Sequence, residues 1–254
     1  MRRYSLSEEQ WEQIKWLLPG KAGDVGATGK DNRLFVEAVL YRYRAGIPWR
    51  DLPERFGLWK TVHTRFSRWA VNGVWEKAFD NLAQAADNEY AMIDSTIVRA
   101  HQHSAGMVGV QKKDPCEAIG RSSGGLSTKI HATVDALGNP VNFYLTQGQC
   151  SDLEGAEVLI SELTAPMVLA DKAYDADARM ITPLKAAGGT AVIPSKKNRK
   201  QPPDHDKYLY RERHLVETFF CKLKQFRAIA TRYDKSARNF LAAIHLAASV
   251  VWLA

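Results

Sequence analysis

Cysteine is scarce in this chain, and long apolar runs are missing from it. The 254 residues include three cysteines, Cys116, Cys150 and Cys221, which lie far apart and form no CxxC pair. Such usage is typical of proteins in a reducing compartment. The opening residues, MRRYSLSEEQ, lack the apolar core of a signal peptide, and the longest apolar run, near residues 242–254, is too short to span a bilayer. We therefore expect a cytoplasmic protein without a membrane partner.

Two familiar ligand motifs are also absent. The glycine-rich segment 23–30, GDVGATGK, is not a phosphate-binding P-loop, because its glycine spacing differs and no strand precedes it. His101, His103, Cys116 and His131 follow no common zinc-site spacing, so we interpret them as polar loop residues. The chain contains no internal repeat and no low-complexity segment.

Positive charge is in excess, and the excess is unevenly placed. Lys and Arg number 35 against 28 Asp and Glu, for a net charge of +7. Residues 195–254 hold 13 basic and 5 acidic side chains, whereas residues 90–194 hold 8 basic and 11 acidic. An acidic middle followed by a basic end suits a metal-binding pocket beside a phosphate-binding surface. The net charge alone would not establish a nucleic-acid partner.

The stretch 208–227, YLYRERHLVETFFCKLKQFR, predicts one helix, because it has no Gly or Pro and its apolar residues recur at helical spacing. At about 100° per residue, Tyr210, Arg213, Glu217 and Lys224 fall within roughly 60° of one another. A carboxylate among bases and a phenol suits a phosphodiester substrate, since the acid can hold a divalent cation and the bases can hold phosphate oxygens. An amphipathic helix with a solvated charged edge would show the same pattern.

Two aspartates are placed on or just after predicted strands. Residues 90–98 read as a buried strand interrupted by Asp94, whose charge is costly there unless it is paired or bound to a metal, although a turn or edge position also fits. Residues 167–170 form a short buried strand that leads into Asp171, and strand carboxyl ends are where open α/β sheets place ligand groups. Further strands are predicted over residues 126–136, 141–147 and 190–193. Helices are predicted over residues 153–163 and in the segment after Asp175 that ends at residue 187. A loop is predicted over residues 101–127.

The first 89 residues are predicted to be helical. Ser7 and Gln10 form a capping-box pattern that begins one helix, and Asp31 begins a second helix that stops at Gly46. A last helix is predicted over residues 74–86, followed by a domain boundary.

Between these helices, two short helices around a glycine, over residues 50–56 and 61–69, are typical of a helix-turn-helix. Polar side chains on and before the second helix would contact base edges and phosphates in a major groove. An ordinary helical hairpin with a wet outer face fits the same spacing. The candidate contact residues are Lys60, His63, Thr64, Ser67 and Arg68.

The spacing of Tyr210, Arg213, Glu217 and Lys224 resembles the Tyr-Arg-Glu-Lys signature of bacterial insertion-sequence transposases with a DDE catalytic site. Within the IS4/IS5-like superfamily, the compact IS5-type group is also similar in the runs WRDLP, EAIGRSSGGLSTKIHATVD and ADKAYD. The resemblance covers nearly the whole chain. It implies an α/β fold: a ribonuclease-H-like catalytic domain with a mixed five-stranded sheet over residues 90–254, preceded by an all-α helix-turn-helix DNA-binding domain over residues 1–89.

The same resemblance implies an enzyme that binds the terminal inverted repeats of an element, cleaves them by metal-dependent hydrolysis, and joins the 3′ ends to target DNA by transesterification. Asp94, Asp171 and Glu217 would be catalytic and would hold two Mg²⁺ or Mn²⁺ ions. The protein would act on double-stranded DNA in the bacterial cytoplasm, at the nucleoid, as a homodimer assembled on DNA. A catalytically silent DNA-binding regulator and a nuclease of the same fold remain alternatives.

The resemblance assigns DNA contacts to Tyr210, Arg213 and Lys224. A basic loop before the catalytic helix is either a further DNA contact or a solvated loop. Its bases are Lys196, Lys197, Arg199 and Lys200. Because only a short segment separates the fifth predicted strand from this helix, no inserted domain covers the active site.

Overall fold

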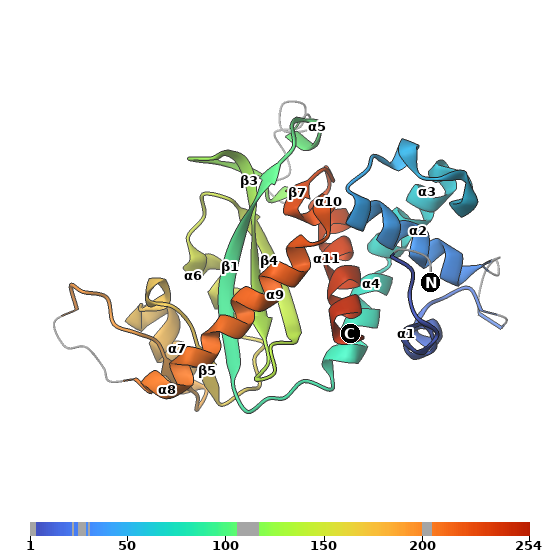
Figure 1. Ribbon diagram of the computed structural model, residues 1–254. Coiled ribbons are helices and arrows are strands. Elements are labelled where there is room, and N and C mark those ends of the chain that lie inside the picture. The colour runs from blue at the N-terminus through green and yellow to red at the C-terminus, as the bar shows by residue number, and fades with distance from the viewer. Residues whose placement is uncertain (1–3, 22, 25–28, 30, 106–116, 200–204) are drawn as a thin grey trace. The chain divides into compact units, whose positions relative to one another are not determined.

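The described chain forms two compact units (Figure 1). The computed structural model describes residues 4–21, 23–24, 29, 31–105, 117–199 and 205–254. A helical unit combines Met1–Gln84, His101–Lys112 and Leu223–Ala254, and a sheet unit combines Ala85–Ala100 and Lys113–Lys222. Among the described residues, no helix is long and apolar enough to cross a membrane.

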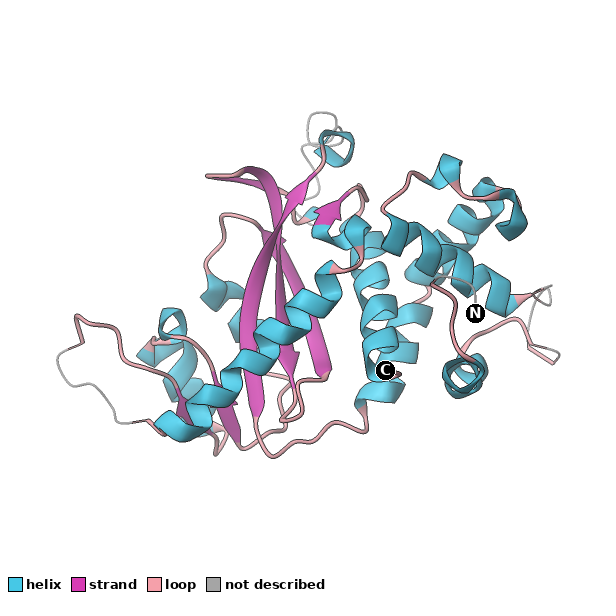
Figure 2. Cartoon of the chain, viewed as in Figure 1, coloured by secondary structure: helices cyan, strands magenta, loops and turns pink. Residues whose placement is uncertain are grey.

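A mixed sheet forms the centre of the sheet unit (Figure 2). Its strand order is β2-β3-β1-β5-β6, with β4 beside β3. Strand β3 is antiparallel to β1, β2 and β4, whereas β1, β5 and β6 are parallel to one another. The prediction of a mixed α/β sheet is thus confirmed, but the predicted number of five strands is wrong, since β2 is a further strand of this sheet. The strands are β1 (Ala91–Ala100), β2 (Gly120–Ser122), β3 (Gly125–Val134), β4 (Pro140–Gln147), β5 (Met167–Leu169) and β6 (Thr190–Val192).

The loop predicted over residues 101–127 is wrong at both ends, where Gln102–Ala105 forms the short helix α5 and Gly120–Ser122 forms strand β2. Strand β2 pairs with the start of β3 through a tight turn in which Ser122 lies opposite Gly125. Gly125 has a φ of +98°, in the region that glycine adopts most readily. The glycines that suggested a loop therefore make a hairpin turn. Residues 106–116 of the predicted loop, including Cys116, lie outside the described residues.

Helices pack on both faces of the sheet. Successive side chains of a strand point to opposite faces, so His131 of β3 faces α6, where its ring lies against Gly155, and Phe143 of β4 faces Phe219 of α9 at a ring distance of 5.7 Å. A Cβ at position 155 would overlap the His131 ring, which is why a glycine suits that point of α6. The interpretation of His131 as a polar loop residue is therefore wrong, because it is a fully buried residue of β3. The helical segments of this unit are α6 (Asp152–Ile160), η5 (Lys172–Tyr174), η6 (Asp177–Ile181), α7 (Thr182–Ala186), α8 (Lys207–Tyr210), η7 (Arg211–Arg213) and α9 (His214–Lys224).

The single helix predicted over residues 208–227 is wrong in two places. A 3₁₀ turn, η7, interrupts it, and α9 ends at Lys224. Phe226 leaves the helix with φ −79° and ψ 97°, and its carbonyl accepts hydrogen bonds that start α10 (Arg227–Ala230). Its side chain is only 2% exposed, so burial of this ring outweighs continuation of the helix.

The helical unit has an aromatic core. Phe66 of α3 lies 5.7 Å from the rings of both Tyr43 and Trp75, and all three side chains are buried. In the same unit, α11 packs against α4, where His245 stacks on Phe79. The remaining elements of this unit are α1 (Glu8–Ile14), η1 (Lys15–Leu17), α2 (Asn32–Ala45), η2 (Trp49–Asp51), η3 (Glu54–Phe56), α3 (Trp59–Val71), α4 (Val74–Ala83), α5 (Gln102–Ala105), β7 (Thr231–Arg232) and α11 (Ala237–Trp252).

The predicted helix starts are confirmed in this unit. Ser7 and Gln10 form the capping box of α1, Asp31 caps α2, and Gly46 ends α2 in the left-handed conformation. The helix predicted over residues 50–56 is wrong: this segment forms two 3₁₀ turns, η2 and η3, separated by Pro53. Proline lacks an N–H group, so an α-helix cannot run through this position without losing a hydrogen bond.

Candidate active site

Asp94 lies in the middle of β1, on the face of the sheet that α9 covers. Its register partner Ala132 pairs in turn with Phe143, which contacts α9. The Ser95 N–H donates to Asp94 Oδ1 at 2.7 Å, and Arg213 Nη1 donates to Asp94 Oδ2 at 2.9 Å. The carboxylate side chain is 21% exposed. A charged group inside a strand is thereby paired, as its position requires.

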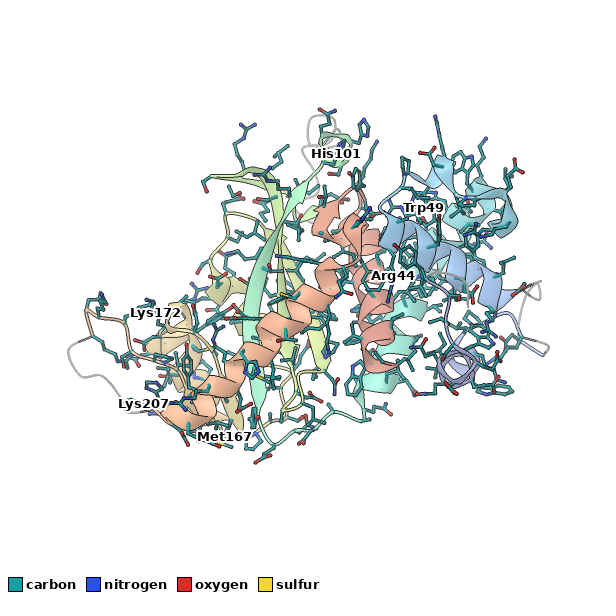
Figure 3. All side chains as sticks on the ribbon, in the orientation of Figure 1. Arg44, Trp49, His101, Met167, Lys172 and Lys207 are labelled. Atoms are coloured by element: carbon teal, nitrogen blue, oxygen red, sulfur yellow. The ribbon has the colours of Figure 1, made fainter. Side chains whose placement is uncertain are left out.

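Asp171 is brought beside Asp94 by the parallel pairing of β1 and β5. Met92 is the partner of Leu169, and the two aspartates each follow two residues later. Asp171 caps η5, since its Oδ1 accepts the Ala173 N–H at 2.8 Å. Lys172, labelled in Figure 3, is the first residue of this turn. The two carboxylates therefore lie on neighbouring parallel strands, Asp94 within β1 and Asp171 just past the carboxyl end of β5.

Glu217 joins this pair through Arg213. Arg213 ends η7 and Glu217 follows in the first turn of α9, at the i,i+4 spacing at which helical side chains meet. The Arg213 guanidinium forms ion pairs with both Asp94 and Glu217. Its side chain is 18% exposed, whereas that of Glu217 is 55% exposed. One arginine thus connects the first and third predicted catalytic acids.

Burial has the largest effect on the pKa of Asp94, but it does not decide the direction of the pKa shift of Arg213. It raises the pKa of Asp94, the Ser95 N–H and Arg213 oppose this shift, and the charge of Asp171 adds to it. Burial also acts to lower the pKa of Arg213, but the charges of Asp94 and Glu217 outweigh it and raise that pKa. The site stabilises positive charge at this place in the sheet.

Three carboxylates from separate segments suit a hard divalent cation, which prefers oxygen ligands. Asp94 and Asp171 interact electrostatically, and Glu217 reaches the same guanidinium as Asp94. Among the described residues, however, no three His, Cys, Asp or Glu side chains are close enough together to hold a metal ion. The three carboxylates are suitable ligands for a metal ion, but two of them, Asp94 and Glu217, are paired with the guanidinium of Arg213.

A second polar network, which was not predicted from the sequence, lies on the other face of β1. Ser95 Oγ donates to Asp152 Oδ1 at 2.5 Å, and Lys129 Nζ donates to the same oxygen at 2.7 Å. Lys129 Nζ also donates to the Cys150 carbonyl at 2.6 Å. The signal available in the sequence was a lysine within an apolar strand, two residues before His131.

Tyr174 connects the two faces electrostatically. Burial raises the pKa of its phenol, and the charges of Asp94, Asp152 and Asp171 raise it further. The Ser95 hydroxyl acts in the opposite direction. Asp152 is therefore a fourth carboxylate near the two sheet aspartates, already neutralised by Lys129.

The other residues predicted around the acids have different surroundings. Tyr210 is half-buried with its ring 5.6 Å from that of His205, and Lys224 is exposed at the end of α9. In the basic loop, Lys197 is exposed, but Lys196 and Arg199 bind Asp175: the Lys196 N–H donates to Asp175 Oδ2 at 2.8 Å. Lys200 lies outside the described residues.

The five residues predicted on or before α3 divide into two groups. Lys60, Thr64 and Arg68 are exposed. His63 instead lies with its ring 5.2 Å from Trp49, and burial lowers its pKa. Ser67 Oγ accepts a hydrogen bond from Asn239 of α11 at 3.1 Å. These last two side chains face the protein, because α3 turns them toward η2 and α11.

Two family models match this chain. Residues 87–252 match "Transposase DDE domain", and residues 6–79 match "Putative transposase of IS4/5 family". The chain therefore belongs to the transposase family with a DDE domain. Together with the relatives described next, this confirms the predicted resemblance to insertion-sequence transposases.

Three bacterial relatives are similar to part of the chain. An uncharacterized protein, y4sN, of Sinorhizobium fredii is 48% identical over 101 residues, or 40% of this chain and 81% of the relative. The putative transposase for insertion sequence element IS6501 of Brucella ovis is 42% identical over 132 residues, or 50% of this chain and 99% of the relative. An uncharacterized 16.2 kDa protein of insertion element IS402 from Burkholderia cepacia is 29% identical over 112 residues, covering 39% and 76%.

Among solved structures, a pre-cleavage Mos1 transpososome is similar over 92% of this chain and 82% of that chain, at 12% sequence identity and a TM-score of 0.29. A TM-score this low does not define a shared fold.

Proposed function

We propose that this chain is a DNA transposase that binds insertion-sequence ends, cleaves them, and joins the freed 3′ ends to target DNA. The observation that carries the proposal is the meeting of Asp94 and Asp171 on neighbouring parallel strands, with Glu217 held to Asp94 through Arg213. In a family defined by its DDE domain, these are the three acids that the sequence predicts.

A ribonuclease-H-like catalytic domain is the fold that we infer for residues 90–254. It is supported by the spatial order β4-β3-β1-β5-β6, in which an antiparallel meander is extended by two parallel strands. We infer that residues 1–89 bind DNA, with α3 as the contacting helix. The exposed positions of Lys60, Thr64 and Arg68 support this assignment.

The catalytic acids would hold two Mg²⁺ or Mn²⁺ ions. When bound, these ions would activate the attacking oxygen and stabilise the leaving oxygen of a phosphodiester. Asp94, Asp171 and Glu217 would bind them, and Arg213 would exchange carboxylate partners for phosphate oxygens of the DNA. Tyr210 and Lys224 would hold the backbone next to the cut, as would the loop containing Lys196, Lys197, Arg199 and Lys200.

The protein's own residues contribute orientation and charge in this scheme. The Ser95 N–H fixes one oxygen of Asp94, and the Ala173 N–H fixes one oxygen of Asp171. Asp171 Oδ2, and Asp94 Oδ2 once Arg213 has exchanged it for a phosphate, would be available for the ions. Two element ends must be brought together, so the enzyme would assemble as a homodimer on the terminal inverted repeats, in the bacterial cytoplasm at the nucleoid.

The test is a cleavage and strand-transfer assay with labelled element-end DNA, target DNA and Mg²⁺. We expect Asp94→Asn, Asp171→Asn and Glu217→Gln each to reduce cleavage more than about a thousandfold, equivalent to about 4 kcal/mol of barrier. The matched control is Glu212→Gln, which removes a neighbouring carboxylate that contacts neither Asp94 nor Arg213 through a salt bridge within the described chain. Cleavage by any acid variant at the wild-type rate would contradict the assignment.

A DNA-binding regulator without chemistry is the second candidate. The observation that favours it is the engagement of Asp94 and Glu217 by Arg213, with no three-acid group close enough for a metal among the described residues. Specific binding without cutting, equal in the wild type and in Asp171→Asn, would establish the regulator. Cutting without capture of the labelled 3′ end by target DNA would indicate a nuclease.

A further inference from the structure

A basic pocket lies beside α3 in the helical unit. Its volume is about 620 Å³, and the side chains that matter here are Lys60, Thr61, Thr64, Arg65, Arg68 and Asn72. Residues 60, 64, 68 and 72 recur every fourth position, so they form one stripe along the helix and just past its end. None of the residues that line the pocket in the described structure is acidic.

Arg65 is fixed in the wall of this pocket. Its guanidinium carbon lies 4.3 Å from the centre of the Phe35 ring and 4.7 Å from the centre of the Trp69 ring. It also donates a hydrogen bond to Asn32 Oδ1. Gly29 permits this arrangement, because a Cβ there would come within 2.7 Å of Arg65 Nη2. The planar group is therefore held in place before any ligand arrives.

The charge of Arg65 is not neutralised by a contact. Within the described part of the chain, no carboxylate lies within ion-pair distance of it, and neither Lys60 nor Arg68 forms a salt bridge. Burial lowers the pKa of Arg65, and the more distant charge of Asp31 only partly opposes this. A half-buried cation without an anionic partner is stabilised by an anion that enters the pocket.

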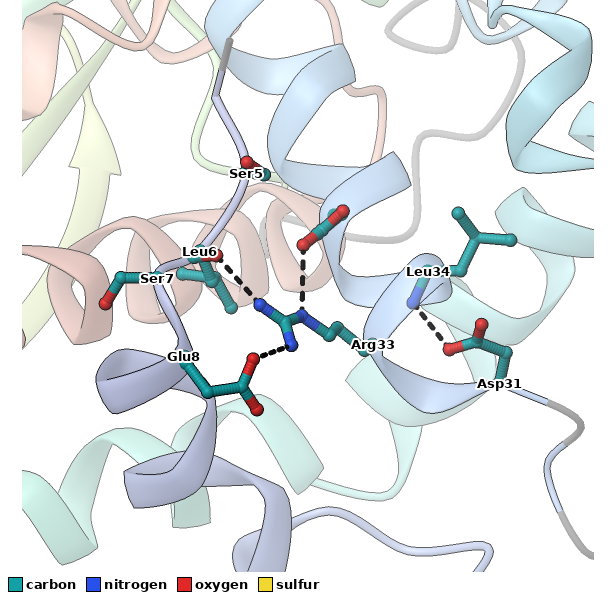
Figure 4. Close-up of a pocket in the computed structure, with 8 residues that line it drawn as sticks. Ser5, Leu6, Ser7, Glu8, Asp31, Arg33 and Leu34 are labelled. Carbon is teal, nitrogen blue, oxygen red and sulfur yellow. Dashed lines mark hydrogen bonds and ion pairs between the residues drawn. The ribbon is translucent and has the colours of Figure 1, made fainter. Parts of the chain in front are cut away.

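A second pocket of the same unit shows the contrasting arrangement (Figure 4). Its arginine, Arg33, already has ion pairs with Glu8 and Glu37 and donates to the Leu6 carbonyl at 3.1 Å. The positive charge of Arg33 is neutralised by the protein itself, and the lining of that pocket has three carboxylates, Glu8, Asp31 and Glu37, against one arginine. Of these two pockets, only the one beside α3 has an excess of positive charge.

From these contacts we infer that the pocket beside α3 binds backbone phosphates of duplex DNA, with Arg65 as its fixed anchor and Lys60 and Arg68 on either side. The stripe from residue 60 to residue 72 spans about 18 Å at about 1.5 Å per residue. That is longer than one phosphate group, so it fits a run of backbone phosphates better than a free anion. This inference rests on the proposed DNA-binding function and names the surface that performs it.

The inferred surface differs from the one predicted by sequence spacing. Thr61, Arg65 and Asn72 belong to it, whereas His63 and Ser67 face the protein. Phosphate contacts set the register and orientation of a protein on DNA but do not read its sequence. The pocket should therefore contribute equally to the binding of element ends and of unrelated duplexes.

Fluorescence anisotropy with the full chain, in the absence of added divalent metal, tests this inference. One labelled duplex carries the element end and the other has random sequence, and each is titrated over a range of salt concentrations. We expect Arg65→Gln, Lys60→Gln and Arg68→Gln each to weaken binding to both duplexes by about tenfold and to reduce the salt slope by about 0.9.

Arg55→Gln is the matched control. Arg55 also stacks on two rings of the helical unit, those of Tyr41 and Phe56, but it does not line the pocket. Its substitution should leave both affinities and both slopes unchanged. Since Arg65→Gln could disturb the local packing, Lys60→Gln and Arg68→Gln, which change exposed side chains, provide the test that is independent of folding.

The outcomes separate the inference from the proposed function. If the wild-type protein binds neither duplex, the proposed function itself fails. If it binds DNA and the three pocket variants behave like Arg55→Gln, the inference is overturned while the proposed function stands. A loss confined to the element-end duplex would also overturn it, because backbone contacts cannot distinguish the two sequences.

Discussion

Arg213 in the sheet unit and Arg65 in the helical unit are both half-buried, and they differ in what balances their charge. Arg213 pairs with two carboxylates, Asp94 and Glu217. Arg65 stacks on two rings and, among the described residues, has no carboxylate within ion-pair distance. The first arrangement marks a place where the protein has excess negative charge to neutralise. The second arrangement marks a place where the protein supplies no negative charge to its arginine.

The comparison suggests opposite ligands for the two regions. Carboxylates held together by an arginine can exchange that arginine for metal cations, since both supply positive charge to the same oxygens. An arginine without a carboxylate partner can bind a phosphate, which supplies the missing negative charge. A DNA-processing protein needs both kinds of site, one for the chemistry and one for the backbone.

The largest effect on stability should come from breaking the ion pair of a third arginine, Arg42, which is buried together with its carboxylate partner. Arg42 Nη1 and Asp234 Oδ2 are 3.3 Å apart, with side chains only 3% and 6% exposed. Asp234→Ala would leave Arg42 without its carboxylate partner and should lower the free energy of unfolding by about 3–5 kcal/mol. Urea unfolding followed by tryptophan fluorescence measures this change.

The control for this variant is Glu8→Ala, which breaks the exposed pair with Arg33. The Glu8 side chain is 69% exposed, so its loss should change the free energy of unfolding by about 1 kcal/mol or less. Equal effects of the two substitutions would show that burial does not decide the strength of these pairs.

A smaller effect on the free energy of unfolding should follow from low pH, at which buried histidines would have to take up a proton. Burial lowers the pKa of His131 and of His245 from 6.5 to about 4. Both are therefore neutral in the folded protein, while the unfolded chain takes up a proton below about pH 6.5. Stability should be complete above pH 6.5 and should fall as the pH drops toward 4, by about 3 kcal/mol for each histidine.

Urea unfolding of the wild type and of His245→Gln at pH 7 and pH 4.5 checks this expectation. The variant should lose less stability between the two pH values, because one of the two buried groups no longer titrates. Identical losses in the two proteins would mean that His245 is already accessible to protons in the folded state.

Local sequence signals predicted the framework well. The capping box of Ser7 and the left-handed Gly46 depend on neighbouring residues alone, and both are confirmed. The apolar runs around Asp94 and before Asp171 predicted the two strands that bring these aspartates together. Signals of this kind act within a few residues, so one sequence is enough to read them.

Partners distant in sequence could not be read in this way. The pairing of Lys129 with Asp152 joins a strand to a helix start, and the bond from Asn239 to Ser67 joins α11 to α3. The break at Phe226 depends on the burial of its ring rather than on helix propensity. Whether a carboxylate lies close enough to neutralise an arginine likewise depends on the fold. For this reason Arg65 was not identified from its spacing in the sequence.

The smallest effect on stability should come from removing the arginine that pairs with the acids of the candidate active site. The charge and hydrogen bond of Arg213 lower the pKa of Asp94, against the burial that raises it. Arg213→Gln should therefore raise the pKa of Asp94 further above its usual 3.8 in the metal-free and DNA-free protein. Carboxyl ¹³C NMR of Asp-labelled protein, assigned with Asp94→Asn, follows this titration.

The sign of the linked stability change follows from that direction. A carboxyl with a raised pKa in the folded state opposes folding when it is ionised, so its cost is absent at a pH below 3.8 and complete above the raised pKa. Because the pair is partly exposed, Arg213→Gln should change the free energy of unfolding at neutral pH by about 1 kcal/mol or less. Arg211→Gln, which removes an exposed neighbouring charge, should leave the pKa of Asp94 unchanged. If both variants gave the wild-type titration, Arg213 would not be paired with Asp94 in solution, and the two arginines would no longer differ in the way that separates a cation site from an anion site.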